Sequence, residues 1–368
     1  MSLAVFLDPV SNHFEEDRLF GGTWPGHHSG PYLHVRDVFA ERGVPVHTAD
    51  RLFRGQSPGE RNAYFALGNV RNYRKLAGRD DVVLSGLFHV EAPILSPTTY
   101  SQTPEASRYF ERVYSFSNAE ALAPFGCAGV PLRHFLIPEP YEGIDGFEGL
   151  WARRDRNFLC MISQNKLPTL QVSELYTERL RLLEHFSRSD SIDLYGVGWD
   201  RMPFRVGERR TPQQLVRVYR IVREHVPFMR NHPYEDLIRR VYRGAVESKA
   251  ETMSRYTFAI TYENMVLDGW INEKIFDAFV VGTIPIYLGA PDVTEYIPED
   301  CFIDPRRFSD YFGLEAFLRS LGPREIATYR ENAKDFLASE RFRPFSKAAF
   351  ADIFLGAVED DFGVSLRS

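Results

Sequence analysis

The residues best suited to chemistry lie close together in the second half of this 368-residue chain. An apolar run predicted to be a strand, 256–262, is followed by the carboxylate of Glu263 and the amide of Asn264, and a short loop then leads to 272–274. The pattern after that loop predicts a helix with Asn272 as its N-cap. Helix N-termini bind anions. A lysine in the first turn opposes the helix dipole, so Lys274 either offsets a bound anion or is a solvated surface charge.

A second carboxylate of interest is Glu91, in the N-terminal half. It follows a predicted strand, 81–87, and Pro93 ends regular structure two residues later. A carboxylate suits general-base catalysis when partial burial raises its pKa toward neutrality; a buried salt bridge is the alternative role. His89 lies on the same side of an extended chain as Glu91. The sequence fits both a His–Glu pair and a purely structural hydrogen bond for His89.

Alternating strands and helices must position these carboxylates. In the N-terminal half we expect a helix at 32–42 and strands at 4–7, 44–47, 81–87, 116 and 135–137. In the C-terminal half we expect helices at 174–186 and 273–281 and strands at 158–162, 192–195, 256–262, 284–288 and 301–303. Such alternation favours parallel sheets. The predicted fold class is therefore α/β, with two Rossmann-like αβα domains and a cleft between them.

Ligands of open parallel sheets bind outside the carboxyl ends of the strands. In the C-terminal half these ends are polar or contain glycine, at 163–165, 196–198, 263–264 and 289–291. One segment does not fit a minimal Rossmann unit: residues 201–255 contain 13 Lys and Arg against 6 Asp and Glu. Apolar spacing predicts helices there at 215–222 and 237–242. Its arginines are either solvated or face an anionic ligand in the cleft.

Composition excludes several classes of protein. The chain has 44 basic and 50 acidic side chains, a formal net charge of −6, which argues against a protein that coats nucleic acid. No apolar run reaches the roughly 18–20 residues that span a bilayer, and no secretory signal is recognisable at the start. Three cysteines without CxxC spacing do not make a disulfide framework. We therefore expect a cytoplasmic protein.

Residues 249–304 resemble the α1,3-fucosyltransferase family, glycosyltransferase family 10. The family pattern reads K…YKF…FEN…VTEK…AGT(V/I)P(V/I)..G.P. The similar segments of this chain are Lys249, Tyr256-Thr257-Phe258, Tyr262-Glu263-Asn264, Ile271-Asn272-Glu273-Lys274, Gly282-Thr283-Ile284-Pro285-Ile286 and Gly289-Ala290-Pro291. Residues 158–165, the helix from Arg179 and 192–196 also look like the family's SN…R…L…VD.YG pattern. The segment 88–93 is similar to the family's E(S/T)P segment. Trp270 stands where the family usually has Tyr, and Asn272 where it has Thr.

The resemblance implies a GT-B fold with the acceptor domain first. We expect an acceptor-binding domain at 1–150, a GDP-fucose-binding domain at 151–345 with a helical insertion at 205–250, and a C-terminal helix at 346–368. Glu91 is the expected general base, and Glu263 is its rival. The expected donor-binding residues are Asn165, Arg179, Tyr256, Glu263, Asn264, Trp270, Glu273 and Lys274. Sugar sites use aromatic platforms, so the glycine-rich segment 21–30 contributes the expected acceptor-binding residues Trp24, His27 and His28.

The resemblance further implies an inverting glycosyltransferase that moves fucose from GDP-fucose to a hydroxyl of a glycan. We expect a bacterial enzyme of protein glycosylation or polysaccharide biosynthesis, with a GDP-sugar and a glycan as partners. Peripheral membrane contact stays open. No cofactor or metal is expected, because the family needs no DxD motif and His27-His28 lacks a third ligand in register. Two alternatives are a GT-B transferase for another nucleotide sugar and a non-catalytic module that binds glycans or nucleotides.

Overall fold

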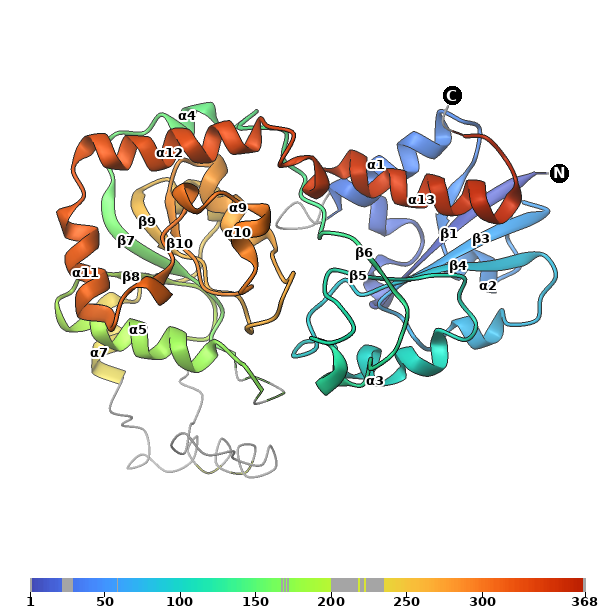
Figure 1. Ribbon diagram of the computed structural model, residues 1–368, viewed down its shortest axis with the longest axis horizontal. Helices are drawn as coiled ribbons and strands as arrows, with labels where there is room; N and C mark the ends of the chain where they lie inside the picture. Colours follow the sequence, from blue (N-terminus) through green and yellow to red (C-terminus); the bar gives the residue numbers. More distant parts are fainter. Residues whose placement is uncertain are drawn as a thin grey trace.

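The computed structural model describes residues 2–21, 29–57, 59–166, 168, 170, 172–199, 218, 222 and 235–366. Among these residues, two parallel sheets form the centres of two lobes (Figure 1). The sheet of the N-lobe has the order β2-β1-β3-β4-β5-β6, with β1 (Leu3–Pro9), β2 (Val46–Thr48), β3 (Arg61–Leu67), β4 (Val82–Phe88), β5 (Val113–Ser115) and β6 (Leu132–His134). The sheet of the C-lobe has the order β10-β9-β7-β8, with β7 (Asn157–Ile162), β8 (Asp193–Tyr195), β9 (Tyr256–Ile260) and β10 (Ile284–Ile286). The predicted α/β class with parallel sheets is confirmed.

Helices cover both sheets. Those that follow N-lobe strands are α1 (Gly30–Ala40), α2 (Asp50–Phe53) and α3 (Pro97–Ala106). Those of the C-lobe are α4 (Glu148–Trp151), α5 (Tyr176–Arg188), α7 (Glu235–Val241), α8 (Lys249–Met253), α9 (Glu273–Val280), α10 (Val293–Tyr296), α11 (Tyr311–Ser320) and α12 (Pro323–Leu337). Short 3-10 helices lie at Asn12–Phe14, Arg18–Phe20, Tyr73–Lys75, Ala123–Phe125, Glu299–Cys301, Pro305–Arg307 and Arg343–Phe345.

The sheets are buried on both faces, which explains the short continuous apolar runs in the sequence. Successive residues of a strand point to opposite faces. Along β1, Ala4 and Phe6 pack into one buried cluster, whereas Val5 and Leu7 pack into a second one on the other face. Each sheet is therefore covered by a core on both faces. In open parallel sheets of this kind, ligands bind outside the carboxyl ends of the strands.

The last helix, α13 (Lys347–Phe362), leaves the C-lobe and packs on the N-lobe beside α1 (Figure 1). Phe354 is fully buried, with its ring stacked on that of Phe88 at a centroid distance of 4.8 Å. Arg112 donates to the Asp361 carboxylate at 2.6 Å, and both side chains are buried. The N-lobe therefore depends on the end of the chain for part of its core.

Three expectations from the sequence need correction. The central strand β3, paired with both β1 and β4, was not predicted, because its sequence Arg-Asn-Ala-Tyr-Phe-Ala-Leu has no Val or Ile. The strand expected at 301–303 is reduced to one bridge between Ile286 and Ile303. β5 and β6 begin about three residues before the predicted positions 116 and 135. The predicted helix 237–242 is confirmed as α7, while the one at 215–222 lies mainly outside the described residues.

Candidate active site

A cluster of charged and polar side chains is built around Glu263, which follows β9. We call Glu263, Asn272, Glu273, Lys274 and Arg179 the donor-side cluster, after the role expected for this part of the chain. Its side chain is fully buried, and its carboxylate accepts hydrogen bonds from the Asn272 backbone N–H at 3.3 Å and from Lys274 Nζ at 2.9 Å. The Cβ that a side chain would add at Gly289 would lie 2.4 Å from Glu263 Cγ, so only glycine fits beside this carboxylate. The end of β9 is thus locked onto the first turn of α9.

Asn272 is the N-cap of α9, as the sequence predicts. Its side-chain oxygen accepts from the Lys274 backbone N–H at 3.3 Å and from Lys274 Nζ at 3.0 Å. Burial by itself lowers the pKa of Lys274, but the carboxylates of Glu263 and Glu273 outweigh burial and raise this pKa above its ordinary value. Lys274 is therefore a charged lysine whose position is fixed by hydrogen bonds to Glu263 and Asn272. Glu263 and Glu273 offset part of its charge, and the anion expected from the sequence stays a prediction.

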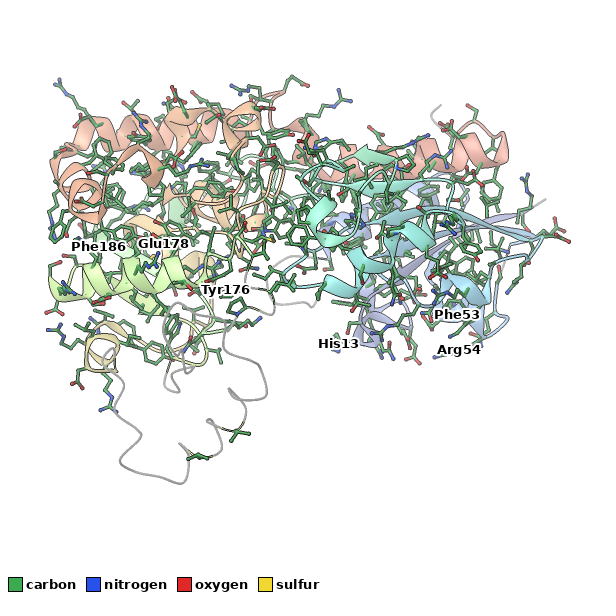
Figure 2. All side chains as sticks on the ribbon, turned by 60° about the horizontal axis from the view of Figure 1, so that its bottom comes forward. His13, Phe53, Arg54, Tyr176, Glu178 and Phe186 are labelled. Carbon is green, nitrogen blue, oxygen red and sulfur yellow. The ribbon has the colours of Figure 1, made fainter. Side chains whose placement is uncertain are left out.

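Arg179 joins this cluster from α5. Its NH2 group donates to the backbone carbonyls of Tyr262 and Glu263, both at 2.6 Å, and to the Asn264 side chain at 3.0 Å. Its guanidinium also lies over the ring of Tyr176, 5.1 Å from the centroid. Tyr176 is at the end of α5 nearer the N-lobe, and Phe186 is toward the other end (Figure 2). One terminal nitrogen makes all three bonds.

The neighbouring strand end contributes Asn165. Its backbone N–H donates to Val197 O and its side-chain amide to Gly198 O, both at 3.0 Å. These bonds tie the turn after β7 to the turn after β8. The expected donor residues Asn165, Arg179, Glu263, Asn264, Glu273 and Lys274 are therefore all found at the carboxyl edge of the C-lobe sheet or in the helices that border it.

Glu91 reaches this region from the N-lobe, three residues after β4 ends. Its side chain is exposed, and among the described residues its carboxylate makes no hydrogen bond or ion pair. The protein around the carboxylate removes part of its hydration. This desolvation and the negative charge of Glu273 raise the pKa of Glu91 to about 7, although the positive charges of Lys274 and Lys166 lower it. The N-lobe carboxylate thus faces the donor-side cluster, accessible and near the midpoint of its titration at neutral pH.

Two predicted site residues are not brought to this place. Tyr256 begins β9, where its hydroxyl donates to Asp193 at 2.7 Å; Glu263 lies past the other end of that strand, roughly 20 Å away. Trp270 is 2 % exposed and packs on Phe116 of the N-lobe, with ring centroids 4.6 Å apart. Tyr256 therefore lies apart from the other expected donor residues, and Trp270 packs between the two lobes.

Three further expectations concern the N-lobe. His89 is fully buried and bonds to Ser115 and Thr103, so it does not pair with Glu91. Trp24, His27 and His28, the expected acceptor residues, lie outside the described residues. Within the described part of the chain, no group of three or more His, Cys, Asp and Glu side chains is arranged to hold a metal ion.

Sequence reasoning missed Lys166 and Tyr176 as neighbours of Glu91. Lys166 lowers the pKa of Glu91, and Glu91 contributes to raising the pKa of Tyr176, whose main cause is burial. Their positions supply a usable signal. Lys166 directly follows the polar turn after β7. Tyr176 precedes Arg179 by three residues, so Tyr176 and Arg179 share a face of α5.

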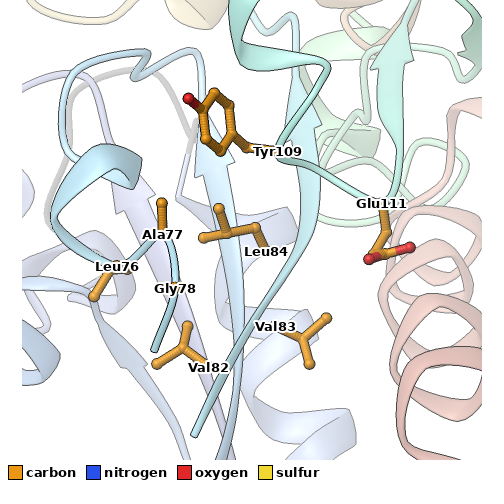
Figure 3. A pocket seen from close by; sticks show the side chains of 8 residues that line it. All are labelled: Leu76, Ala77, Gly78, Val82, Val83, Leu84, Tyr109 and Glu111. Atoms are coloured by element: carbon orange, nitrogen blue, oxygen red, sulfur yellow. The ribbon is translucent and has the colours of Figure 1, made fainter. Parts of the chain in front are cut away.

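An open hollow of about 470 Å³ lies elsewhere, at the amino end of β4 (Figure 3). Val82, Val83 and Leu84 line it together with Tyr109 and Glu111, which precede β5. The opposite end of β4 leads to Glu91, so this hollow is on the edge of the sheet away from the charged cluster.

No helix among the described residues is long and apolar enough to cross a membrane.

The chain forms two α/β lobes, each built on a sheet of parallel strands, with charged groups at the strand ends that face each other. This is the architecture of a GT-B glycosyltransferase fold. Sucrose-phosphate synthase from Thermosynechococcus elongatus shares this fold, with a TM-score of 0.56, 12 % identity, and coverage of 99 % of this chain and 100 % of that one. Residues 161–334 match glycosyltransferase family 10 (fucosyltransferase), C-terminal domain. This part of the chain, a little under half of its length, is therefore similar to glycosyltransferase family 10, as the motifs indicated.

Curated relatives match a short part of the chain. An alpha-(1,4)-fucosyltransferase of Arabidopsis thaliana is 35 % identical over 75 residues, 20 % of this chain and 19 % of the relative. The alpha-(1,3)-fucosyltransferase FucT of Helicobacter pylori is 36 % identical over 66 residues, 18 % of this chain and 14 % of the relative. The similarity thus spans less than a fifth of the length of either relative.

Proposed function

We propose that this protein is an inverting fucosyltransferase that transfers fucose from GDP-fucose to a hydroxyl group of a glycan. The observation that carries the proposal is the position of Glu91, whose carboxylate has no partner among the described residues and faces Lys274 across the two lobes. A base on one lobe and fixed positive charge on the other is the arrangement that in-line displacement of a nucleoside diphosphate requires. The match of residues 161–334 to the family 10 model and the names of the relatives support fucose as the transferred sugar.

In the proposed reaction, Lys274 and Arg179 stabilise the negative charge that develops on the departing GDP. Such fixed electrostatic groups act strongly because they need no reorganisation during the reaction. Lys274 supplies a point charge and Arg179 a planar fork. These two cations provide the positive charge at the phosphates, and Glu273, in the first turn of α9, is placed to accept a hydrogen bond from a sugar or ribose hydroxyl.

Glu91 removes the proton from the acceptor hydroxyl as its oxygen attacks the anomeric carbon. Attack occurs on the face opposite the phosphate, so a β-linked donor gives an α-linked product. A pKa of about 7 suits this role, because the carboxylate is largely ionised at slightly alkaline pH yet basic enough to hold the proton. Glu263, the other candidate base, is buried and paired with Lys274, so we assign it to the donor side.

We further propose that the enzyme acts in the bacterial cytoplasm on a surface polysaccharide or oligosaccharide. The three cysteines are all free and buried, which suits a reducing compartment. Fractionation of cells that express the protein, followed by an activity assay of each fraction, tests this assignment. Activity confined to a periplasmic or secreted fraction would contradict it.

The donor is tested by thermal unfolding with GDP, UDP, CMP and their sugars. A ligand at 100 times its Kd adds about 2.7 kcal/mol to the free energy of unfolding, so GDP should raise Tm clearly and UDP should not. Incubation of the protein with GDP-fucose and a glycan library should then give fucosylated product and GDP. A larger shift with UDP would support a transferase for another nucleotide sugar, and GDP binding without any transfer would support a binding module.

A further inference from the structure

One face of α3 holds the chain segments that follow β3 and β4. The hydroxyl of Thr99 donates to the Gly68 carbonyl at 2.8 Å, and the hydroxyl of Tyr100 donates to the Glu91 carbonyl at 2.6 Å. Thr103 Oγ1 lies 2.9 Å from His89 Nε2. These three side chains, which we name the α3 brace, are all buried. The brace therefore fixes the main chain at the edge of the sheet from which Glu91 projects.

His89 extends the brace to the next strand. Its Nδ1 lies 3.2 Å from Ser115 Oγ at the end of β5, and burial lowers its pKa to about 3, so the ring is neutral. The neutral ring donates through one nitrogen and accepts through the other. Its centroid lies 4.4 Å from that of the Tyr100 ring. Tyr100 is thus immobilised both by packing against His89 and by its bond to the Glu91 main chain.

Glu91 has no other hydrogen bond among the described residues. Its carboxylate is unpaired, so packing and the bond from Tyr100 to its backbone carbonyl set where this side chain begins. A general base has to lie within hydrogen-bond reach of the proton that it removes, and a misplacement of about 1 Å can cost a large factor in rate. The geometry of the base consequently depends on a residue that itself need not touch substrate.

We propose that Tyr100 is a positioning residue for Glu91, holding the carboxylate in place for proton transfer from the acceptor. This inference rests on the proposed function. It is specific to Tyr100 because a phenylalanine would keep the ring contact with His89 and would remove only the hydroxyl that bonds to the Glu91 carbonyl.

The variant Tyr100→Phe tests the inference, with Tyr73→Phe as its matched control. Tyr73 is 1 % exposed and belongs to the same buried cluster, but its hydroxyl has no hydrogen-bond partner in the part of the chain that the structure describes. We expect Tyr100→Phe to lower kcat on the order of 10-fold and to leave KM for GDP-fucose unchanged. The control should keep the kcat of the unaltered enzyme. Equal kcat in both variants would overturn the inference.

Two further readouts separate positioning from general destabilisation. In Tyr100→Phe the ascending limb of the rate–pH profile should move to lower pH, because a loosened Glu91 is better solvated and its pKa falls. In a Glu91→Gln background, Tyr100→Phe should cause no further loss of rate, because residues that act as one unit are not additive. The same fractional loss in both backgrounds would show a role that does not act through Glu91.

Hydrogen exchange gives a test that does not depend on activity. Amides in peptides that cover 89–96 should exchange faster in Tyr100→Phe than in Tyr73→Phe, while peptides of the C-lobe should be unchanged. Unchanged exchange at 89–96 would overturn the inference. If the unaltered protein transfers no fucose, the proposed function fails, and the exchange result still decides whether Tyr100 fixes the segment that carries Glu91.

Discussion

The two facing edges of the lobes carry the same kind of residue in opposite states. On the C-lobe, Glu263 is buried and bonded to Lys274 and to the first turn of α9. On the N-lobe, the Glu91 carboxylate is exposed and unpaired within the described residues, and only its main chain is held. The difference separates two tasks. Under the proposed function, groups that bind a charged donor can be fixed in advance, whereas a group that exchanges a proton must remain free to do so.

The substitution with the largest expected effect removes the free carboxylate. Glu91→Gln keeps size and shape but cannot accept a proton, so turnover should fall on the order of 10²–10⁴-fold. GDP affinity by calorimetry and Tm should stay near those of the unaltered protein, because the Glu91 carboxylate makes no hydrogen bond or ion pair with the described residues. Transfer at the original rate by a folded, GDP-binding Glu91→Gln variant would show that Glu91 is not the base.

The fixed side of the comparison is broken by Lys274→Ala, which should affect both rate and stability. Loss of an electrostatic group at the phosphates should lower turnover on the order of 10²–10³-fold. Glu263 would be left buried without its counter-ion, which typically costs about 3–5 kcal/mol of unfolding free energy. Denaturant unfolding and steady-state kinetics measure the two effects.

A second substitution separates these effects. Adding Glu263→Gln to Lys274→Ala should recover much of the lost unfolding free energy, because no uncompensated charge then remains, but it should not restore turnover. Recovery of both quantities together would mean that Lys274 has a structural role only.

The pH dependence sharpens the comparison with a smaller change. Only ionised Glu91 can accept the proton, and its pKa is raised to about 7. The rate should therefore rise with pH through about 7 and approach a plateau above it, with roughly a tenfold difference between one pH unit below that pKa and the plateau. Steady-state assays from pH 5.5 to 8.5 should show this limb. A profile flat over this whole range would mean a base with an ordinary carboxyl pKa.

The smallest effect on activity is expected from a substitution of Tyr256, which lies far from the facing strand ends of the two lobes. Tyr256→Phe removes the hydroxyl that donates to Asp193 and should cost about 1 kcal/mol of unfolding free energy. GDP affinity and turnover should be unchanged, since the ring lies at the other end of β9. A clear loss of GDP affinity at unchanged Tm would restore Tyr256 as a donor-binding residue.

The part of the donor side between Glu263 and Lys274 was easier to predict from sequence, because these residues are close together in the chain. Glu263 ends one predicted strand, and the cap, acid and lysine of α9 follow within about a dozen residues. Local rules for strand ends and helix caps therefore place them correctly. The identity of Asn272 as the N-cap is a direct success of those rules.

The remaining features depend on contacts between distant segments, which no local pattern encodes. The spacing of His89 and Glu91 predicted a shared strand face, but β4 ends at Phe88 and the two side chains separate. Trp270 follows a donor-domain strand, yet its partner Phe116 belongs to the N-lobe. Tyr100 carries no recognisable motif, and its importance became visible only when α3 was placed against the segment after β4.

The return of α13 to the N-lobe has a consequence for synthesis of the protein. A ribosome releases the N-terminal segments first, and domains commonly fold as they emerge. Here Phe350 and Phe354 complete the aromatic core that contains Phe65 and Phe88, so the first lobe made is finished by nearly the last helix made. Until residues 347–362 emerge, the apolar face that they cover stays exposed, and exposed apolar surface is prone to aggregation.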